Sequence, residues 1–161
     1  LGSIREEGRE RVFLMSSTHG AEMCGMGALL KTIEIYKRDK VTDHLWNFGR
    51  NLTKRCNKLS QDLGLGDYFH VDGIACSPTY TIKDKNGNGS MAMRTLFMQE
   101  MIKNGVIMGA IVTSFAHGEV EIELTLEAME KSLDVYKRAL EEGVEKYLVG
   151  PVRKPVFRKI N

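Results

Sequence analysis

The chain has 161 residues, of which 42% are hydrophobic and 27% charged, a composition typical of about one globular domain. Its formal net charge of +2 is too balanced to indicate a nucleic-acid partner or an anionic membrane surface. No run approaches the ~18 apolar residues of a membrane-spanning helix, and residues 1–12 lack the pattern of a signal peptide. We therefore expect a cytoplasmic protein that binds neither nucleic acid nor membrane.

In chain order, the hydrophobic spacing first predicts helical structure. Residues 1–11 have the pattern of a helix end and a connector, and residues 12–15 form a short extended run. Apolar residues then recur at helical spacing over residues 21–38 and again over residues 43–63. Gly64 and Gly66 are expected to end the second of these helices, because glycine is favoured just beyond a helix C-terminus.

The second half of the chain mixes strand and helix patterns. Residues 68–71 and 75–82 are predicted to be extended, residues 84–89 a turn, residues 93–103 a helix and residues 106–112 a short apolar strand. Residues 119–125 alternate as a strand would, but a strong helical pattern continues from them, so we predict one helix over residues 119–146. Pro151 and Pro155 mark an irregular tail. The order α-α-β-β-α-β-α predicts an α+β fold with a small antiparallel sheet covered on one face by helices.

The segment over residues 12–22, VFLMSSTHGAE, places several hydroxyl side chains just before the first predicted helix. Serine and threonine are favoured at helix N-caps, and a helix N-terminus also attracts phosphate groups. An ordinary N-cap and an anion-binding turn are therefore both compatible with this spacing.

Other candidate motifs favour structural roles. Residues 84–89, DKNGNG, match the first half of a calcium loop, but its twelfth position is Thr95 instead of the required glutamate. The four histidines show no metal-ligand spacing, and His117, just before a predicted helix, is the best placed of them for a site or for a cap. The three cysteines are odd in number and widely spaced, so we expect reduced thiols that are mostly buried. We predict no metal site and no catalytic residue in this chain.

Five segments in the same order resemble the C-terminal portion of a class III, fold type I, pyridoxal-phosphate-dependent aminotransferase, of the group similar to glutamate-1-semialdehyde 2,1-aminomutase. They are residues 16–34 (SSTHGAEMCGMGALLKTIE), 73–80 (GIACSPTY), 94–108 (RTLFMQEMIKNGVIM), 114–133 (SFAHGEVEIELTLEAMEKSL) and 147–159 (YLVGPVRKPVFRK).

The resemblance implies a domain organisation and a cofactor. Residues 1–20 would be the end of the large cofactor domain, and residues 21–161 the small C-terminal domain that closes over the site. The enzyme would be a homodimer, with Ser17 and Thr18 binding the phosphate of the neighbouring subunit's pyridoxal phosphate. Ser17 occupies the position of the family's conserved threonine, and Thr18 follows one place later.

Two departures from the family matter for function. The lysine that holds the cofactor covalently, and the aspartate that pairs with its pyridine nitrogen, lie upstream of the matching segments, so this chain alone is expected to be inactive. Residues 107–115 also lack the arginine that binds a substrate carboxylate in many family members. This favours an aminomutase-like enzyme or a substrate other than an amino acid, within the general class of small-molecule amino donors and acceptors. The alternative is a non-catalytic dimerisation or interaction domain derived from the same fold.

Overall fold

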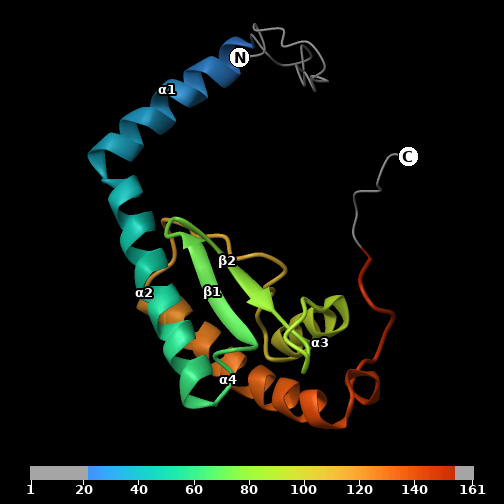
Figure 1. The fold of residues 1–161 in the computed structure, drawn as a ribbon. Coiled ribbons are helices and arrows are strands. Elements are labelled where there is room, and N and C mark those ends of the chain that lie inside the picture. Colours follow the sequence, from blue (N-terminus) through green and yellow to red (C-terminus); the bar gives the residue numbers. More distant parts are fainter. Residues whose placement is uncertain (1–21, 155–161) are drawn as a thin grey trace, which may run out of the picture. The chain divides into compact units, whose positions relative to one another are not determined.

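The structure, a computed structural model, describes residues 22–154 (Figure 1). The chain divides into two compact units, residues 1–40 and residues 41–161, which we describe separately. The predicted features over residues 1–20, including the boundary at residue 20, lie outside the described residues, as does Pro155. None of the described helices has the length and apolarity needed to cross a membrane.

In the first unit, the described structure is one helix, α1 (Met23–Arg38), preceded by Glu22 in an extended conformation. It confirms the helix expected over residues 21–38. Lys37 and Arg38 lie in its last turn, where positive charge interacts favourably with the helix dipole. None of its 16 residues is buried.

The second unit contains the remaining elements and confirms the predicted α+β class. They are α2 (Val41–Asp62), β1 (Phe69–Ile74), β2 (Ser77–Ile82), α3 (Met91–Lys103), α4 (Glu119–Glu142) and the short 3-10 helix η1 (Val144–Lys146). The two strands pair antiparallel, with Phe69 opposite Ile82 and Val71 opposite Tyr80. Figure 1 shows this hairpin with α2, α3 and α4 around it; α2 packs on β1 and on α4, and α3 packs on α4.

One face of the hairpin lies in the core. Phe69, Val71, Tyr80 and Ile82 alternate along the two strands and are all buried, as expected for a sheet covered on one side. The Phe69 ring lies 4.9 Å from that of Phe97 on α3 and 5.9 Å from that of Tyr80, centroid to centroid. The expected arrangement of a small antiparallel sheet under helices is therefore confirmed.

A glycine lets α2 approach the turn of this hairpin. A β-carbon on Gly49 would lie 1.6 Å from the carbonyl oxygen of Ala75, so only glycine fits at this position of the helix. Asn57, two turns further along α2, binds strand β1. Its side chain donates to the Val71 carbonyl at 2.8 Å and accepts from the Val71 amide at 2.7 Å. Both contacts fix the hairpin against α2.

The strand predicted over residues 106–112 is wrong, because the structure has no regular element in this segment. Gly105 adopts a positive φ of 85°, which turns the chain as α3 ends. The carbonyls of the segment are bound by side chains instead of a strand: the Tyr80 hydroxyl donates to Met108 at 2.7 Å, and Arg94 donates to Gly109 at 3.3 Å. Its apolar residues anchor it without forming a ladder, since Met108 and Ile111 are buried.

The helix predicted over residues 119–146 is correct in type but ends earlier. The region that alternates like a strand is helical from Glu119, which confirms helix over strand there. Gly143 ends α4 with a φ of 98°, a conformation that favours glycine, and η1 follows as a separate turn.

The cysteine prediction is partly wrong. All three thiols are free, as expected, but Cys24 is exposed and Cys76 is half-buried, so only Cys56 is enclosed in the core. Cys24 is exposed, and it lies on α1, none of whose residues is buried.

Candidate functional site

The predicted phosphate ligands, Ser17 and Thr18, lie outside the described residues, and their role stays a prediction. A different candidate site lies within residues 41–154.

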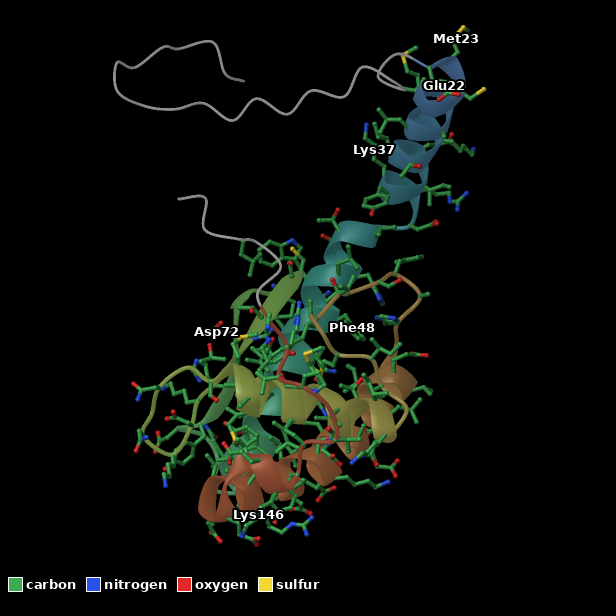
Figure 2. All side chains as sticks on the ribbon, turned by 90° about the vertical axis from the view of Figure 1, so that its right-hand side faces the viewer. Glu22, Met23, Lys37, Phe48, Asp72 and Lys146 are labelled. Atoms are coloured by element: carbon green, nitrogen blue, oxygen red, sulfur yellow. The ribbon has the colours of Figure 1, made fainter. Side chains whose placement is uncertain are left out.

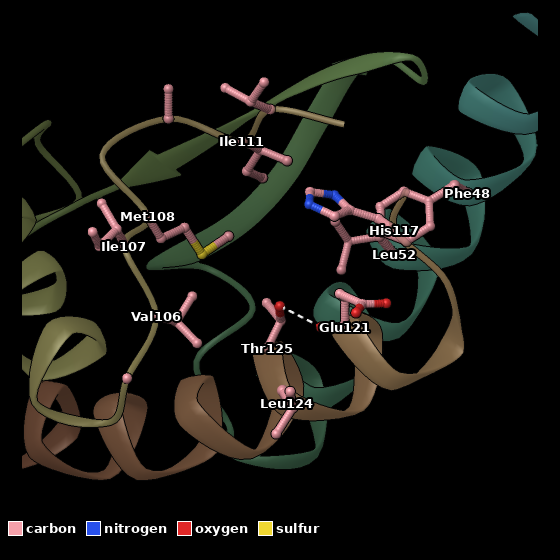
Figure 3. A pocket seen from close by; sticks show the side chains of 13 residues that line it. Phe48, Leu52, Val106, Ile107, Met108, Ile111, His117, Glu121, Leu124 and Thr125 are labelled. Atoms are coloured by element: carbon pink, nitrogen blue, oxygen red, sulfur yellow. Dashed lines mark hydrogen bonds between the residues drawn. The ribbon is translucent and has the colours of Figure 1, made fainter. Parts of the chain in front are cut away.

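A pocket of about 290 Å³ opens in the second unit between α2, the segment after α3, and the first half of α4 (Figure 3). Phe48 and Leu52, one turn apart on α2, form one wall, and Met108 and Ile111 form another. Those four side chains are buried, whereas Ile107, Val112 and Leu124 line the pocket with largely exposed side chains. The pocket is therefore apolar inside and also surrounded by apolar surface.

His117, the histidine that the sequence placed best for a site or for a cap, lines this pocket. Figure 3 shows its ring beside that of Phe48, and the two centroids are 5.6 Å apart. His44 on α2 fixes the loop, because its Nε2 lies 2.9 Å from the His117 carbonyl oxygen and its ring packs edge-on against Phe115. Thr113 holds the start of the same loop by donating to the Cys76 carbonyl at 2.6 Å.

Glu121, the third residue of α4, is the one carboxylate that lines the pocket. The Gly118 amide donates to it at 2.7 Å. This bond, a further bond from its own amide and the nearby His117 hold the pKa of Glu121 below its usual range. Thr125 donates its hydroxyl to the Glu121 backbone carbonyl at 2.7 Å and so has its proton engaged within the helix. The carboxylate acts here as a helix cap that stays ionised at neutral pH.

The donor set of the pocket does not fit pyridoxal phosphate. No lysine or arginine lines it, so the pocket offers neither an amine for a Schiff base nor a cation for a phosphate. The amide that opens α4 already binds the Glu121 carboxylate, whose negative charge would repel a phosphate. This pocket therefore does not fit the cofactor, and its lining is suited to binding an apolar group.

The segment over residues 84–89 has the structural role that the sequence favoured. In the turn over residues 84–89, the Asp84 carboxylate accepts from the amides of Asn86 and Asn88 at 2.9 and 3.1 Å, so it stabilises the turn itself. His70 lies 3.1 Å from Asp72 on the same strand. Within residues 22–154, no cluster of three or more potential ligands could hold a metal ion.

Arg94 is the residue that linear spacing did not reveal. Residues 107–115 contain no arginine, yet the tertiary structure brings the Arg94 guanidinium of α3 onto this segment, where it donates to Gly109 at 3.3 Å. The guanidinium also lies 4.2 Å from the centre of the Tyr80 ring, a cation–π contact. Its partners are carbonyl groups and a ring, which assigns it to holding the segment after α3 in place.

Comparison with known proteins gives a relative for most of the chain. It is 28% identical over 134 residues to a 3-aminobutyryl-CoA aminotransferase of Cloacimonas acidaminovorans (strain Evry), a match that covers 81% of this chain and 32% of the relative. This supports an aminotransferase relationship. The chain spans about a third of the length of that relative. No protein-family profile matches the chain, and no solved structure does.

Proposed function

We propose that this chain is the small C-terminal domain of a pyridoxal-phosphate-dependent class III aminotransferase, similar to the glutamate-1-semialdehyde aminomutase group. The observation that carries the proposal is the similarity to an aminotransferase over 134 residues. The α+β architecture, with its small antiparallel sheet under helices, is compatible with such a domain. The five collinear segments that resemble the family lie between residues 16 and 159.

In the complete enzyme, this chain and the remaining residues would contribute different groups to cofactor binding. When bound, the cofactor supplies the electron sink for amino transfer, and the lysine that holds it would come from outside these 161 residues. Ser17 and Thr18 would contribute hydroxyl and amide donors to its phosphate across a homodimer. The pocket beside Phe48 and Met108 would exclude water from a neighbouring group, since most of its lining side chains are apolar.

The substrate class follows from what the segment after α3 lacks. With no arginine in residues 107–115, and with Arg94 engaged by carbonyl groups, this segment offers no bidentate partner for a carboxylate. We therefore propose a small amine whose carboxylate is absent, masked or bound elsewhere. The named substrate of the relative, an aminoacyl thioester of coenzyme A, belongs to that class.

The test uses the protein encoded by the complete reading frame that contains these residues. We expect it to bind pyridoxal phosphate with a visible absorbance band, and to transfer amino groups from a 3-aminoacyl thioester. The double variant S17A/T18A should bind the cofactor at least ~10-fold more weakly, the effect of losing one or two hydrogen bonds to a charged group. Thr42→Ala, on the exposed start of α2, serves as the matched control. Unchanged cofactor affinity in the double variant would remove the assignment of Ser17 and Thr18.

The second candidate is a non-catalytic dimerisation or interaction domain of the same fold. The exposed apolar side chains of α1 favour a role in association. A protein that binds no pyridoxal phosphate and transfers no amino group, but still self-associates, would support this candidate over an enzyme.

A further inference from the structure

The sequence contains three asparagines that are followed directly by glycine: Asn86, Asn88 and Asn104. In such a pair the backbone nitrogen of the glycine can attack the side-chain carbonyl carbon of the asparagine, because glycine has no side chain to hinder the approach. Asparagine is thermolabile for this reason. The sequence makes the three pairs look equivalent, whereas the structure binds their glycine amides differently.

The glycine amide next to Asn86 is already bound. Gly87 closes a β-turn by donating its amide to the Asp84 carbonyl at 3.0 Å. This hydrogen bond has to break before the Gly87 nitrogen can attack the side chain of Asn86.

The pair at the end of α3 is held by two hydrogen bonds. The Gly105 amide donates to the Ile102 carbonyl at 3.0 Å. The side-chain amide of Asn104 donates to the Glu100 carbonyl at 2.9 Å. Both the attacking nitrogen and the group it would attack are therefore fixed on the helix.

The Gly89 amide, next to Asn88, is free. Gly89 forms an isolated antiparallel bridge with Lys83, and the hydrogen bonds of this bridge join the residues on either side of it, as in the bond from the Asp84 amide to the Asn88 carbonyl at 2.8 Å. In a bridge of this type the N–H of each bridged residue points away from the other chain. Among residues 22–154, neither the Gly89 amide nor the Asn88 side chain makes a hydrogen bond. Residues 85–89 are all exposed on the surface of the second unit, so solvent water reaches the pair (Figure 2).

We propose that Asn88 is a site of spontaneous deamidation, with Gly89 as the internal nucleophile and water as the co-reactant. The Gly89 nitrogen forms a bond to the Asn88 side-chain carbonyl carbon as it loses its proton. The bond from that carbon to Nδ2 breaks, and the proton leaves with the nitrogen as ammonia. Water then opens one of the two carbonyl–nitrogen bonds of the cyclic imide, which leaves aspartate or isoaspartate at residue 88. The two steps together exchange ammonia for water, with no change of oxidation state.

The modification lies where it affects the start of α3. Isoaspartate at residue 88 directs the main chain through the former side chain and lengthens it by one carbon. The Ser90 amide, two residues later, donates to the Ile82 carbonyl at 3.3 Å, and the Ser90 side chain caps α3 by accepting from the Met93 amide at 3.2 Å. A longer main chain disturbs both bonds, so the isoaspartate form should melt at a lower temperature than the aspartate form. The inference rests on these described residues and does not depend on the proposed function.

Peptide mapping of the folded 161-residue chain tests the site. The chain is incubated at mildly alkaline pH, where amide nitrogens lose protons more readily, and is then digested with trypsin beside a sample that was not incubated. Cleavage after lysine and arginine gives one peptide over residues 86–94 and another over residues 104–131, and fragment masses locate the modified residue.

We expect Asn88 to deamidate about 2- to 10-fold faster than Asn86, the effect of one hydrogen bond that must break before the attack. Asn104 should react more slowly still, because two bonds hold it. Equal rates at Asn86 and Asn88 in the folded chain would overturn the proposal. Aspartate without isoaspartate would do so too, because it would indicate direct hydrolysis by water with no part for Gly89.

The unfolded chain is the control for local sequence. In concentrated guanidinium chloride the hydrogen bonds of Gly87 and Gly105 are lost, so the rates at the three asparagines should converge. A preference for Asn88 that is equally large in the unfolded chain would come from the neighbouring residues and would overturn the structural explanation.

Two variants test the roles of the two residues in the folded chain. A β-carbon on Gly89 meets no atom within 4 Å, so Gly89→Ala should fold, yet its methyl group lies beside the attacking nitrogen and should suppress the modification of Asn88. Asn88→Gln keeps the amide but moves its carbonyl carbon one methylene further away, and it should also stop the reaction at this residue. In both variants Asn104 should keep its native rate. An unchanged rate at Asn88 in Gly89→Ala would overturn the proposal.

Discussion

Helices α1 and α2 follow each other in the chain and carry similar apolar patterns, but only one of them is covered. On α2, Phe48, Leu52 and Cys56 lie one turn apart and are buried against the hairpin and α4. On α1, Leu30 and Ile33 belong to an equally regular stripe and are exposed. The periodicity of a sequence thus identifies the face of a helix that needs a partner, but it does not identify the partner. For α2 the partner is within the same unit, whereas no residue of α1 is buried.

The largest expected difference in unfolding free energy comes from replacing a leucine by alanine on each of the two helices. Leu52 is 5% exposed and Leu30 is 70% exposed. Leu52→Ala should lower the free energy of unfolding of the second unit by about 2–5 kcal/mol, because it leaves a cavity in the core. Leu30→Ala should change it by less than about 0.5 kcal/mol, as for other surface substitutions. Urea unfolding followed by circular dichroism, at a concentration low enough to favour monomers, measures both; similar losses would mean that α1 is packed after all.

Glycine-to-alanine substitutions give the next contrast. Gly49→Ala should destabilise the second unit by about 3 kcal/mol, because the new β-carbon would overlap the Ala75 carbonyl and force α2 away from the hairpin. Gly27→Ala on α1 meets no atom within 4 Å and should make that helix more favourable by up to about 1 kcal/mol. Thermal melting of the two variants beside the native chain checks the pair. A tolerated alanine at residue 49 would mean that the approach of α2 to the hairpin is looser than described.

Removing one tyrosine hydroxyl should have a smaller effect on the unfolding free energy of the second unit. This effect is expected for a tyrosine on α4 and not for one on α1. The Tyr136 hydroxyl on α4 donates to the Lys83 carbonyl and lies 3.4 Å from the Tyr68 carbonyl, and its burial raises the pKa of Tyr136. Tyr136→Phe should cost about 1–2 kcal/mol of unfolding free energy, since these carbonyls lose a buried donor. Tyr36→Phe on α1 should leave the second unit unchanged. The same urea series measures the pair, and an unaffected Tyr136→Phe would show that water satisfies the carbonyls instead.

The smallest expected effect requires no substitution and compares the reactivity of two thiols. Burial raises the pKa of Cys56 to about 12, while the neighbouring charge of Arg55 opposes the shift. Because the pKa of Cys56 is raised in the folded chain, the contribution of its neutral thiol to folding stability is fully present below the ordinary thiol pKa of about 8.5. That contribution is lost as pH rises from there towards 12. At pH 8 iodoacetamide should therefore alkylate exposed Cys24 and leave Cys56 unmodified until the chain unfolds. Mass spectrometry of the peptides reports both, and equal rates at the two sites would contradict the enclosed position of Cys56.

Much of the fold could be predicted because its signals are local. The helices and the hairpin follow from hydrophobic spacing, and the turn over residues 84–89 follows from Asp84 and its asparagines. Residues 106–112 were mispredicted because an apolar run resembles a strand, whereas Tyr80 and Arg94, distant in the sequence, bind its carbonyls. The contact of Gly49 with Ala75 is equally non-local.

The candidate site was less accessible to sequence reasoning than the fold. His117 could be recognised from its position before a helix. The pocket itself could not, because its walls come from α2, the segment after α3 and α4, and no linear spacing relates Phe48 to Met108 and Glu121.

Hydrogen exchange of the native chain tests the central contrast between the helices most directly. Amides of α2 should be strongly protected, because its apolar face is buried within the second unit. Amides of α1 should exchange faster, because none of its residues is buried. Equal protection of the two helices would contradict the account.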